Sequence, residues 1–142
     1  METVKNSIKK HEGFRNKVYK DTLGKRTIGY GHLCVEDWWE DDKEYTQAEL
    51  ERIFDKDFDK AKEGASKLYE GCEINDTAKG VIIEMVFQLG TTGVSKFKNM
   101  WKALKETPPN YSVAKIEMLD SRWAKQTPNR AKELSNTIGG IA

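Results

Sequence analysis

The residues best suited to acid–base chemistry in this sequence are two carboxylates and one hydroxyl near its start: Glu12, Asp21 and Thr27. Glu12 ends a predicted helix and precedes Gly13 and Phe14. Asp21 opens a predicted turn, and Thr27 lies on the strand that returns from it. Hydrolysis of a glycosidic bond requires a proton donor for the leaving oxygen and a second carboxylate near the anomeric carbon. Because the Thr27 hydroxyl could hold a water molecule against Asp21, the three side chains have the types that this chemistry needs.

The spacing of these residues does not by itself distinguish a catalytic site from ordinary structural roles. The chain has 23 acidic residues, so many pairs of carboxylates arise by chance. A Glu at a helix end or an Asp at a turn is more often a cap or a solvated charge. A catalytic assignment therefore depends on further residues.

The elements that would position the three side chains are a short helix and a group of short strands. Val4 and Ile8 are spaced as on one helix face, which predicts a helix over residues 3–12 that ends near Gly13. Short strands around a Gly-containing turn are predicted at residues 18–19, 22–25 and 27–32. Gly29 and Gly31 would weaken a strand unless something approaches its backbone closely there.

Helices dominate the rest of the chain. An acidic loop with two tryptophans, residues 35–45, leads to Thr46 and Glu49, which have the spacing of a capping box. The helix that begins there is expected to reach Leu68. A second helix, capped by Asn75 or Asp76 and stopped by Gly90, is apolar nearly all round and should be the buried centre of a helical lobe. Further helices are predicted near residues 95–106, 111–125 and 128–137.

This pattern predicts an α+β fold that is mostly helical. We expect one domain, residues 1–142, with a small antiparallel sheet lobe at 13–45 and a long connecting helix at 46–68. Residues 1–12 would join residues 69–142 in the helical lobe.

Composition narrows the class of protein. Hydrophobic residues make up 37% of the 142 residues and charged residues 33%, which favours a globular protein over a disordered one. The net charge of +1 gives no reason to expect nucleic acid as a partner. The lysines at 96, 98, 102 and 105 are read as a solvated helix face.

Several other classes of site and location are not favoured. Cys34 and Cys72 lack the spacing of a metal site or redox pair and are expected to be free thiols. We expect no metal and no cofactor. The N-terminus lacks the apolar run of a signal peptide, and no stretch is long enough to span a membrane. The protein is therefore expected to be soluble and made in a cytoplasm.

Three blocks of sequence carry a family resemblance. The first comprises Glu12-Gly13-Phe14, Tyr19-Lys20-Asp21, Gly24 and residues 27–33. The second comprises residues 85–90, Thr92-Gly93-Val94 and Phe97, and the third comprises residues 121–123 and 126–132. Together they strongly resemble the lysozymes (endolysins) of T-even bacteriophages, which form glycoside hydrolase family 24. The resemblance implies a lysozyme-like, two-lobed fold.

The resemblance also implies an activity. Proteins of this family are endo-acting muramidases, which cleave the β-1,4 bond between N-acetylmuramic acid and N-acetylglucosamine in bacterial peptidoglycan. By position, Glu12 matches the general acid, and Asp21 and Thr27 match the pair that holds the nucleophilic water. The expected partner is therefore a peptidoglycan glycan strand, attacked by an inverting mechanism that lyses the cell. We expect a monomer that acts on the cell wall.

Other positions match supporting roles in the family. Leu33 and Phe87 match cleft positions, with Gln88 as a neighbour, whereas the apolar pattern alone would place Phe87 in the core. Arg130 matches the basic partner of the catalytic Glu, although by itself it could be a surface ion pair of little energetic value. The remaining match is a structural ion pair, His32–Asp57. Trp123 is expected to pack in the core.

This sequence departs from the family at four places. Two substrate positions that carry a small hydroxyl and an amide in well-known members are Met100 and Glu117 here, which changes the expected sugar contacts. The segment between His32 and Phe54 is short, and the sequence ends without the usual final aromatic residues.

Two other functions remain open. A lytic transglycosylase would use one acid and no water, which the presence of both Asp21 and Thr27 disfavours. An inactive peptidoglycan-binding or scaffold module would be expected to lack Glu12 or Asp21, and both are present.

Overall fold

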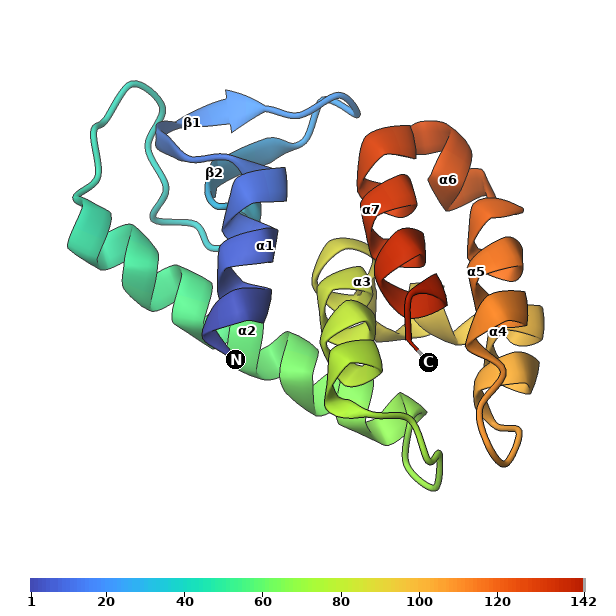
Figure 1. Cartoon of the computed structure of the whole chain (residues 1–142). Helices are drawn as coiled ribbons and strands as arrows, with labels where there is room; N and C mark the ends of the chain where they lie inside the picture. Colours follow the sequence, from blue (N-terminus) through green and yellow to red (C-terminus); the bar gives the residue numbers. More distant parts are fainter. Residues whose placement is uncertain (142) are drawn as a thin grey trace. The chain divides into compact units, whose positions relative to one another are not determined.

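The computed structural model describes residues 1–141, which form mostly helices with one small sheet (Figure 1). In chain order the elements are α1 (Glu2–Glu12), β1 (Arg15–Lys20), β2 (Arg26–Gly29), β3 (His32–Leu33), α2 (Gln47–Leu68), α3 (Asp76–Ser95), α4 (Lys98–Leu104), α5 (Tyr111–Leu119), α6 (Arg122–Gln126) and α7 (Pro128–Gly139). The predicted α+β, mostly helical class is confirmed. Within residues 1–141, no helix combines the length and apolar character needed to cross a lipid bilayer.

The chain divides into two compact units. The first, residues 1–60, contains α1, the sheet and the first part of α2. The second begins at Ala61 and contains the end of α2 and the later helices. The division into lobes predicted from the sequence stays a prediction.

The sheet is antiparallel, with the strands in the order β1-β2-β3. Thr27, on the central strand, pairs with Tyr19 on one side and with Leu33 on the other. Directly opposite residues in such a sheet lie on the same face. Residues 22–25, predicted as strand, instead belong to the turn between β1 and β2, because the Asp21 N–H donates to the Lys25 carbonyl at 2.9 Å and closes the chain on itself.

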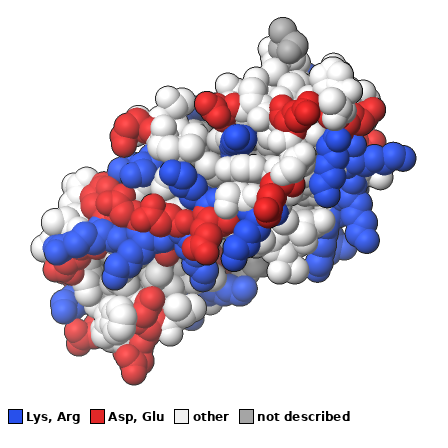
Figure 2. Space-filling view, turned by 90° about the horizontal axis from the view of Figure 1, so that it is seen from below, with Lys and Arg blue, Asp and Glu red and all other residues white. Residues whose placement is uncertain are grey.

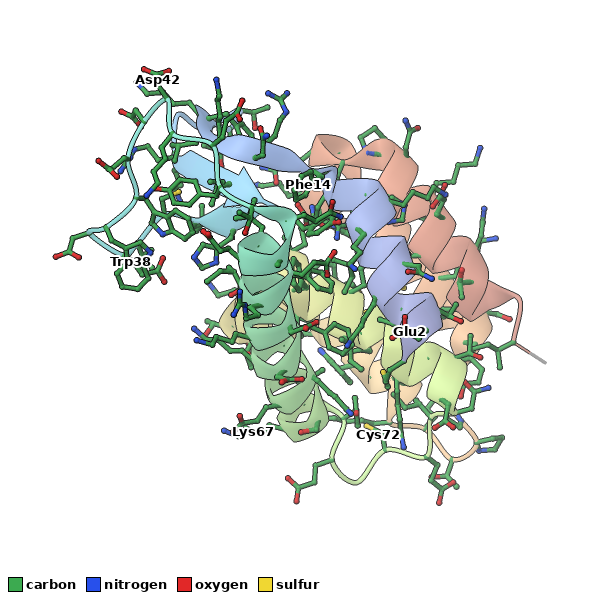
Figure 3. All side chains as sticks on the ribbon, turned by 90° about the vertical axis from the view of Figure 1, so that its left-hand side faces the viewer. Glu2, Phe14, Trp38, Asp42, Lys67 and Cys72 are labelled. Carbon is green, nitrogen blue, oxygen red and sulfur yellow. The ribbon has the colours of Figure 1, made fainter. Side chains whose placement is uncertain are left out.

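One hydrophobic core cluster of the first unit is formed by the sheet, the acidic loop and the start of α2. Its buried members are Ile28, Trp39, Tyr45 and Leu50. Trp38 is 60% exposed and points away from this core, whereas its neighbour Trp39 is 6% exposed (Figure 3). The start of α2 is fixed as predicted, since the Glu49 N–H donates to the Thr46 hydroxyl at 3.1 Å.

In the second unit, α3 confirms the predicted buried helix, with Val81, Ile82 and Ile83 all buried. The Asn75 side chain caps it by accepting from the Ala78 N–H at 2.9 Å. Gly90 leaves helical geometry, with φ 80° and ψ 161°, at the residue where the helix was predicted to stop, but the chain turns helical again and α3 continues to Ser95.

Two predicted features of the later helices are decided by the structure. The single helix predicted over 111–125 is wrong, because the chain breaks at Asp120 and Ser121 into α5 and α6. The Ser121 hydroxyl caps α6 by accepting from the Ala124 N–H at 3.1 Å. The predicted burial of Trp123 is confirmed at 3% exposure.

Cys34 and Cys72 are free thiols within the described chain, as expected.

Candidate functional site

Glu12 is the last residue of α1, and its half-buried side chain packs on the turn between β2 and β3. A Cβ atom at Gly31 would lie 2.5 Å from Glu12 Oε1 and 2.9 Å from Glu12 Cδ. Gly31 also has φ +76°, a conformation that residues with a Cβ rarely adopt. The close approach expected for these glycines is therefore found at Gly31 and not at Gly29, where a Cβ would make ordinary contact with Leu50 at 3.5 Å.

An ion pair between α1 and α2 holds the C-terminal end of α1. Lys9 Nζ lies 3.2 Å from Oε1 and 3.0 Å from Oε2 of Glu51 on α2, and the Tyr30 hydroxyl donates to Glu51 Oε1 at 3.1 Å. The hydrogen bond from Lys9 is the main cause of the lowered pKa of Glu51. Lys9 also lies 5.2 Å from the Tyr30 ring centroid and 5.0 Å from that of Phe54. These contacts join α1, the sheet and α2, and so fix the helix that carries Glu12.

Asp21 is oriented by the backbone of its own turn. Its Oδ1 accepts hydrogen bonds from the Leu23 N–H at 2.8 Å and from the Lys25 N–H at 2.9 Å. Within residues 1–141, no hydrogen bond is made to the other oxygen, Oδ2. The turn therefore orients the carboxylate through Oδ1 and leaves Oδ2 available to a ligand.

Thr27 is coupled to Asp21 through the backbone of Lys25. The residue is buried, at 3% exposure, and its hydroxyl donates to the Lys25 carbonyl at 3.0 Å. The same carbonyl accepts from the Asp21 N–H at 2.9 Å. Because the hydroxyl proton is used in this bond, the Thr27 oxygen can act toward a ligand only as an acceptor.

Tyr19 relates the three predicted residues to one another. It lies directly opposite Thr27 in the sheet. Its pKa is raised, first by burial and then by the negative charges of Glu12 and Asp21, so both carboxylates lie within electrostatic range of one phenol. Tyr19 therefore pairs directly with Thr27 and lies within electrostatic range of both Glu12 and Asp21. Sequence reasoning did not single out Tyr19 or the Lys25 backbone, although both fall between the predicted site residues.

Leu33 continues this face of the sheet. It pairs with Thr27 from the other side and is 43% exposed, so an apolar surface adjoins the Thr27 hydroxyl.

His32 is held between two carboxylates. Its Nδ1 lies 2.7 Å from Asp57 Oδ2, which brings together the predicted pair, and its Nε2 lies 2.9 Å from Glu36 Oε1. Glu36, which sequence reasoning missed, also accepts from Trp39 Nε1–H at 2.6 Å. Ionised carboxylates only accept, so this geometry favours the doubly protonated imidazolium. Burial lowers the pKa of His32, but the bonds to Asp57 and Glu36 outweigh it and leave the pKa raised.

Of the two predicted cleft residues on α3, Gln88 has a structural role in the second unit. Its Oε1 accepts from Trp123 Nε1–H at 2.9 Å, and its Nε2 donates to the Thr127 hydroxyl at 3.3 Å. These bonds tie α3 to α6 and to the start of α7. Phe87, the next residue toward the N-terminus, is half-buried.

Arg130 is largely buried, at 8% exposure, so it does not form the surface ion pair that its sequence position alone allowed. Its Nε donates to Glu84 Oε2 at 2.9 Å, and Glu84 is 1% exposed. Sequence reasoning missed Glu84 because it stands within the apolar run of α3. The pairing of Arg130 with Glu12, which lies in the other unit, remains a prediction from the family resemblance.

Met100 and Glu117 both line a cavity of about 580 Å³ in the second unit. Its apolar surface includes Leu89, Phe97 and Trp123, and charged residues of both signs border it. Met100 is 1% exposed and so contributes to the floor. Nowhere in residues 1–141 do three His, Cys, Asp or Glu side chains gather so that they could hold a metal ion.

Comparison with known proteins identifies the family. The family model described as phage lysozyme matches residues 9–137. The chain is 30% identical, over a 158-residue alignment, to "Probable T4-type lysozyme 2" of Dictyostelium discoideum, covering 93% of this chain and 91% of the relative. It is also 30% identical to "Probable T4-type lysozyme 1" of the same organism, covering 96% and 93% of the two chains.

A viral structural protein shares the same region. The chain is 29% identical to "Pre-baseplate central spike protein Gp5" of Enterobacteria phage T4, covering 92% of this chain and 26% of that larger protein. The family match, which spans most of the chain, supports a lysozyme-type glycoside hydrolase. The chain belongs to the phage lysozyme family.

Proposed function

We propose that the protein is an endo-acting muramidase that hydrolyses the β-1,4 bond between N-acetylmuramic acid and N-acetylglucosamine in bacterial peptidoglycan, and thereby lyses cells. The observation that carries the proposal is the arrangement of Glu12, Asp21 and Thr27 around Tyr19, together with membership of the phage lysozyme family. One carboxyl group is then available as the acid, and a second is paired with a hydroxyl to hold water.

The hydrogen bonds of Asp21 and Thr27 suggest how the water would be oriented. The Thr27 oxygen acts as an acceptor, since its proton goes to the Lys25 carbonyl, and Asp21 Oδ2 is also an acceptor. A water molecule between them would donate one hydrogen to each. Its lone pairs would then face away from both groups, toward the anomeric carbon of a bound sugar.

Glu12 would supply the proton that the leaving oxygen needs. In the proposed step, the Glu12 carboxyl proton moves to the glycosidic oxygen as the bond from that oxygen to the anomeric carbon breaks. The water oxygen forms the new bond to carbon, and its proton passes to Asp21. Gly31 lets the Glu12 carboxyl lie against the backbone, which restricts its position before substrate binds.

This reaction would invert the anomeric configuration. Water held by Asp21 and Thr27 would attack the face opposite the leaving oxygen, so a β-linked substrate would first yield the α-anomer. Thr27 has a short side chain without a carboxylate, so it would orient the water rather than form a covalent intermediate.

The remaining predicted residues have proposed roles in substrate binding or support. Leu33 would contact the sugar beside Thr27, and Phe87 would be a further cleft contact. Met100 and Glu117 would shape contacts made by the cavity of the second unit. Arg130 would support Glu12.

A turbidity assay on permeabilised bacteria, followed by mass spectrometry and proton NMR of the released muropeptides, tests the proposal. A muramidase gives reducing N-acetylmuramic acid ends, with the α-anomer appearing first. Anhydro-muramic products would identify a lytic transglycosylase, and binding to walls without any product would identify an inactive module. Initial β-anomer would overturn the inverting mechanism while leaving hydrolysis intact.

A further inference from the structure

Four lysines of the second unit form a local excess of positive charge. Lys96, Lys98, Lys102 and Lys105 are all exposed, and none of them has an ion-pair partner within the described residues. Some basic residues elsewhere are paired, as in Lys5–Asp55, Lys9–Glu51, Arg26–Asp41 and Lys67–Glu63. The four lysines therefore gather four positive charges without a direct ion pair in one short stretch of a chain whose net charge is only +1.

Three of these lysines surround a groove. Lys98, Lys102 and Lys105 line a hollow of about 360 Å³ together with Leu68, Ser95 and Trp101. Figure 2 shows Lys and Arg side chains gathered together on this side of the second unit. Lys98 and Lys102 are also spaced i, i+4 on α4, an arrangement of like charges that destabilises a helix. A bound anion would relieve this repulsion.

The aromatic residue that lines the groove, Trp101, does not present its ring for stacking. Trp101 is 6% exposed, and its Nε1–H donates to the Val94 carbonyl at 3.0 Å. Proteins that bind single-stranded nucleic acid combine basic grooves with exposed aromatic rings on which bases stack. Because Trp101 is buried and held in place, the groove favours a charged backbone without aromatic bases.

We propose that this lysine groove binds the phosphates of an anionic polyol-phosphate polymer of the bacterial cell wall. The inference rests on the proposed function, which brings the protein to peptidoglycan. Lysine is a compact, mobile cation suited to phosphate groups that repeat along a flexible chain. Binding at the groove and at the glycan would reinforce each other, because a polymer in the same wall raises the effective concentration of the protein there.

Calorimetric titration with purified poly(glycerol phosphate) tests the proposal directly. The test protein carries Lys102→Gln and Lys105→Gln, and leaves Lys98 intact because it also borders the larger cavity. The matched control carries Lys56→Gln and Lys60→Gln, which remove the same charge from α2, where lysines are interspersed with acids. We expect the test variant to bind about fivefold or more weakly than wild type, the control to bind like wild type, and wild-type affinity to fall with added salt.

Two further measurements separate the possible outcomes. A single-stranded oligothymidylate of equal charge should bind more weakly than poly(glycerol phosphate); equal or tighter binding would point to nucleic acid and overturn the proposal. Equal losses in the test and control variants would show a general charge effect and would also overturn it. On walls stripped of phosphate polymers, the test variant should hydrolyse peptidoglycan like wild type. If wild type hydrolyses nothing, the proposed function is wrong, whereas the titration still shows whether the groove binds poly(glycerol phosphate).

Discussion

The carboxyl group of Glu12 lies against the α-carbon of Gly31, so closely that a Cβ at residue 31 would stand 2.5 Å from Oε1. This relationship joins the end of α1 to the turn between β2 and β3. It requires glycine for two separate reasons, the positive φ of +76° and the contact with the carboxyl group. Gly31 is therefore a positioning residue for Glu12, although it has no reactive group.

Replacement of Gly31 by Ala should displace the Glu12 carboxyl group and reduce lytic activity by about 10²-fold, the scale expected for a misplacement of about 1 Å. Gly71→Ala is the matched control, since Gly71 has φ +81° but nothing within 4 Å of the added Cβ. Both variants should lose about 1–2 kcal/mol of unfolding free energy from backbone strain. Activity measured below both melting transitions should fall in Gly31→Ala alone, and equal activities would show that the contact does not matter.

Glu12→Gln should abolish proton donation while preserving size and polarity. General acid–base catalysis contributes about 10²–10⁴-fold, so the rate of wall hydrolysis should fall by at least that range while the fold persists. Glu2→Gln, an exposed change in the first turn of the same helix, is the control and should retain activity. A Glu12→Gln protein that remained active would remove the acid from the proposed mechanism.

Substitutions of Thr27 test whether its hydroxyl holds the water, as proposed. Thr27→Val has nearly the same shape but no oxygen, so it should reduce the hydrolysis rate by about 10²-fold or more. Thr27→Ser keeps the oxygen and should retain much of the activity. The ratio of kcat for Ser to kcat for Val is the informative quantity, because both variants alter packing. If that ratio is near one, the Thr27 hydroxyl does not orient the water.

The histidine cluster of His32, Asp57 and Glu36 should make stability depend on pH. The pKa of His32 is raised above 6.5, so its contribution is full below pH 6.5 and is lost as the pH rises through the folded value. Burial raises the pKa of Glu36, but the bonds from Trp39 and His32 outweigh it and lower the pKa below 4.5. The contribution of Glu36 is therefore present above pH 4.5 and is lost as the pH falls through the folded value.

Glu36→Gln should consequently lower the free energy of unfolding by about 1–2 kcal/mol near pH 5.5, with a smaller effect at alkaline and at strongly acidic pH. Chemical denaturation across this range measures the difference. Glu40→Gln, in the same loop, is the control, because the Glu40 side chain is 69% exposed and its one ion pair within residues 1–141 is with Lys43 at 3.5 Å. A Glu36→Gln curve parallel to wild type at every pH would contradict the coupling to His32.

Local chemistry in the sequence determined much of the architecture. The Thr46 hydroxyl begins α2, Gly13 ends α1 and Gly90 interrupts α3, because each depends on the backbone conformation or capping capacity of the residue itself. The turn residue Asp21 and the strand residue Thr27 were likewise placed correctly from nearby residues. The blocks that resemble phage lysozymes determined the family, which most of the chain confirms.

Only the tertiary structure decided which distant groups meet. Nothing in the local pattern pairs Lys9 with Glu51, or Gln88 with Trp123, and the apolar run around Glu84 hides the partner of Arg130. Periodicity shows which face of an element is buried, but it does not identify the element that will cover that face. The break at Ser121 escaped prediction for a related reason, since the apolar spacing continues through it while the cap forms only when the chain turns. The candidate site follows the same division: the sequence supplies the proposed acid, Glu12, together with Asp21 and Thr27, and only the structure shows that the Glu12 side chain packs against Gly31.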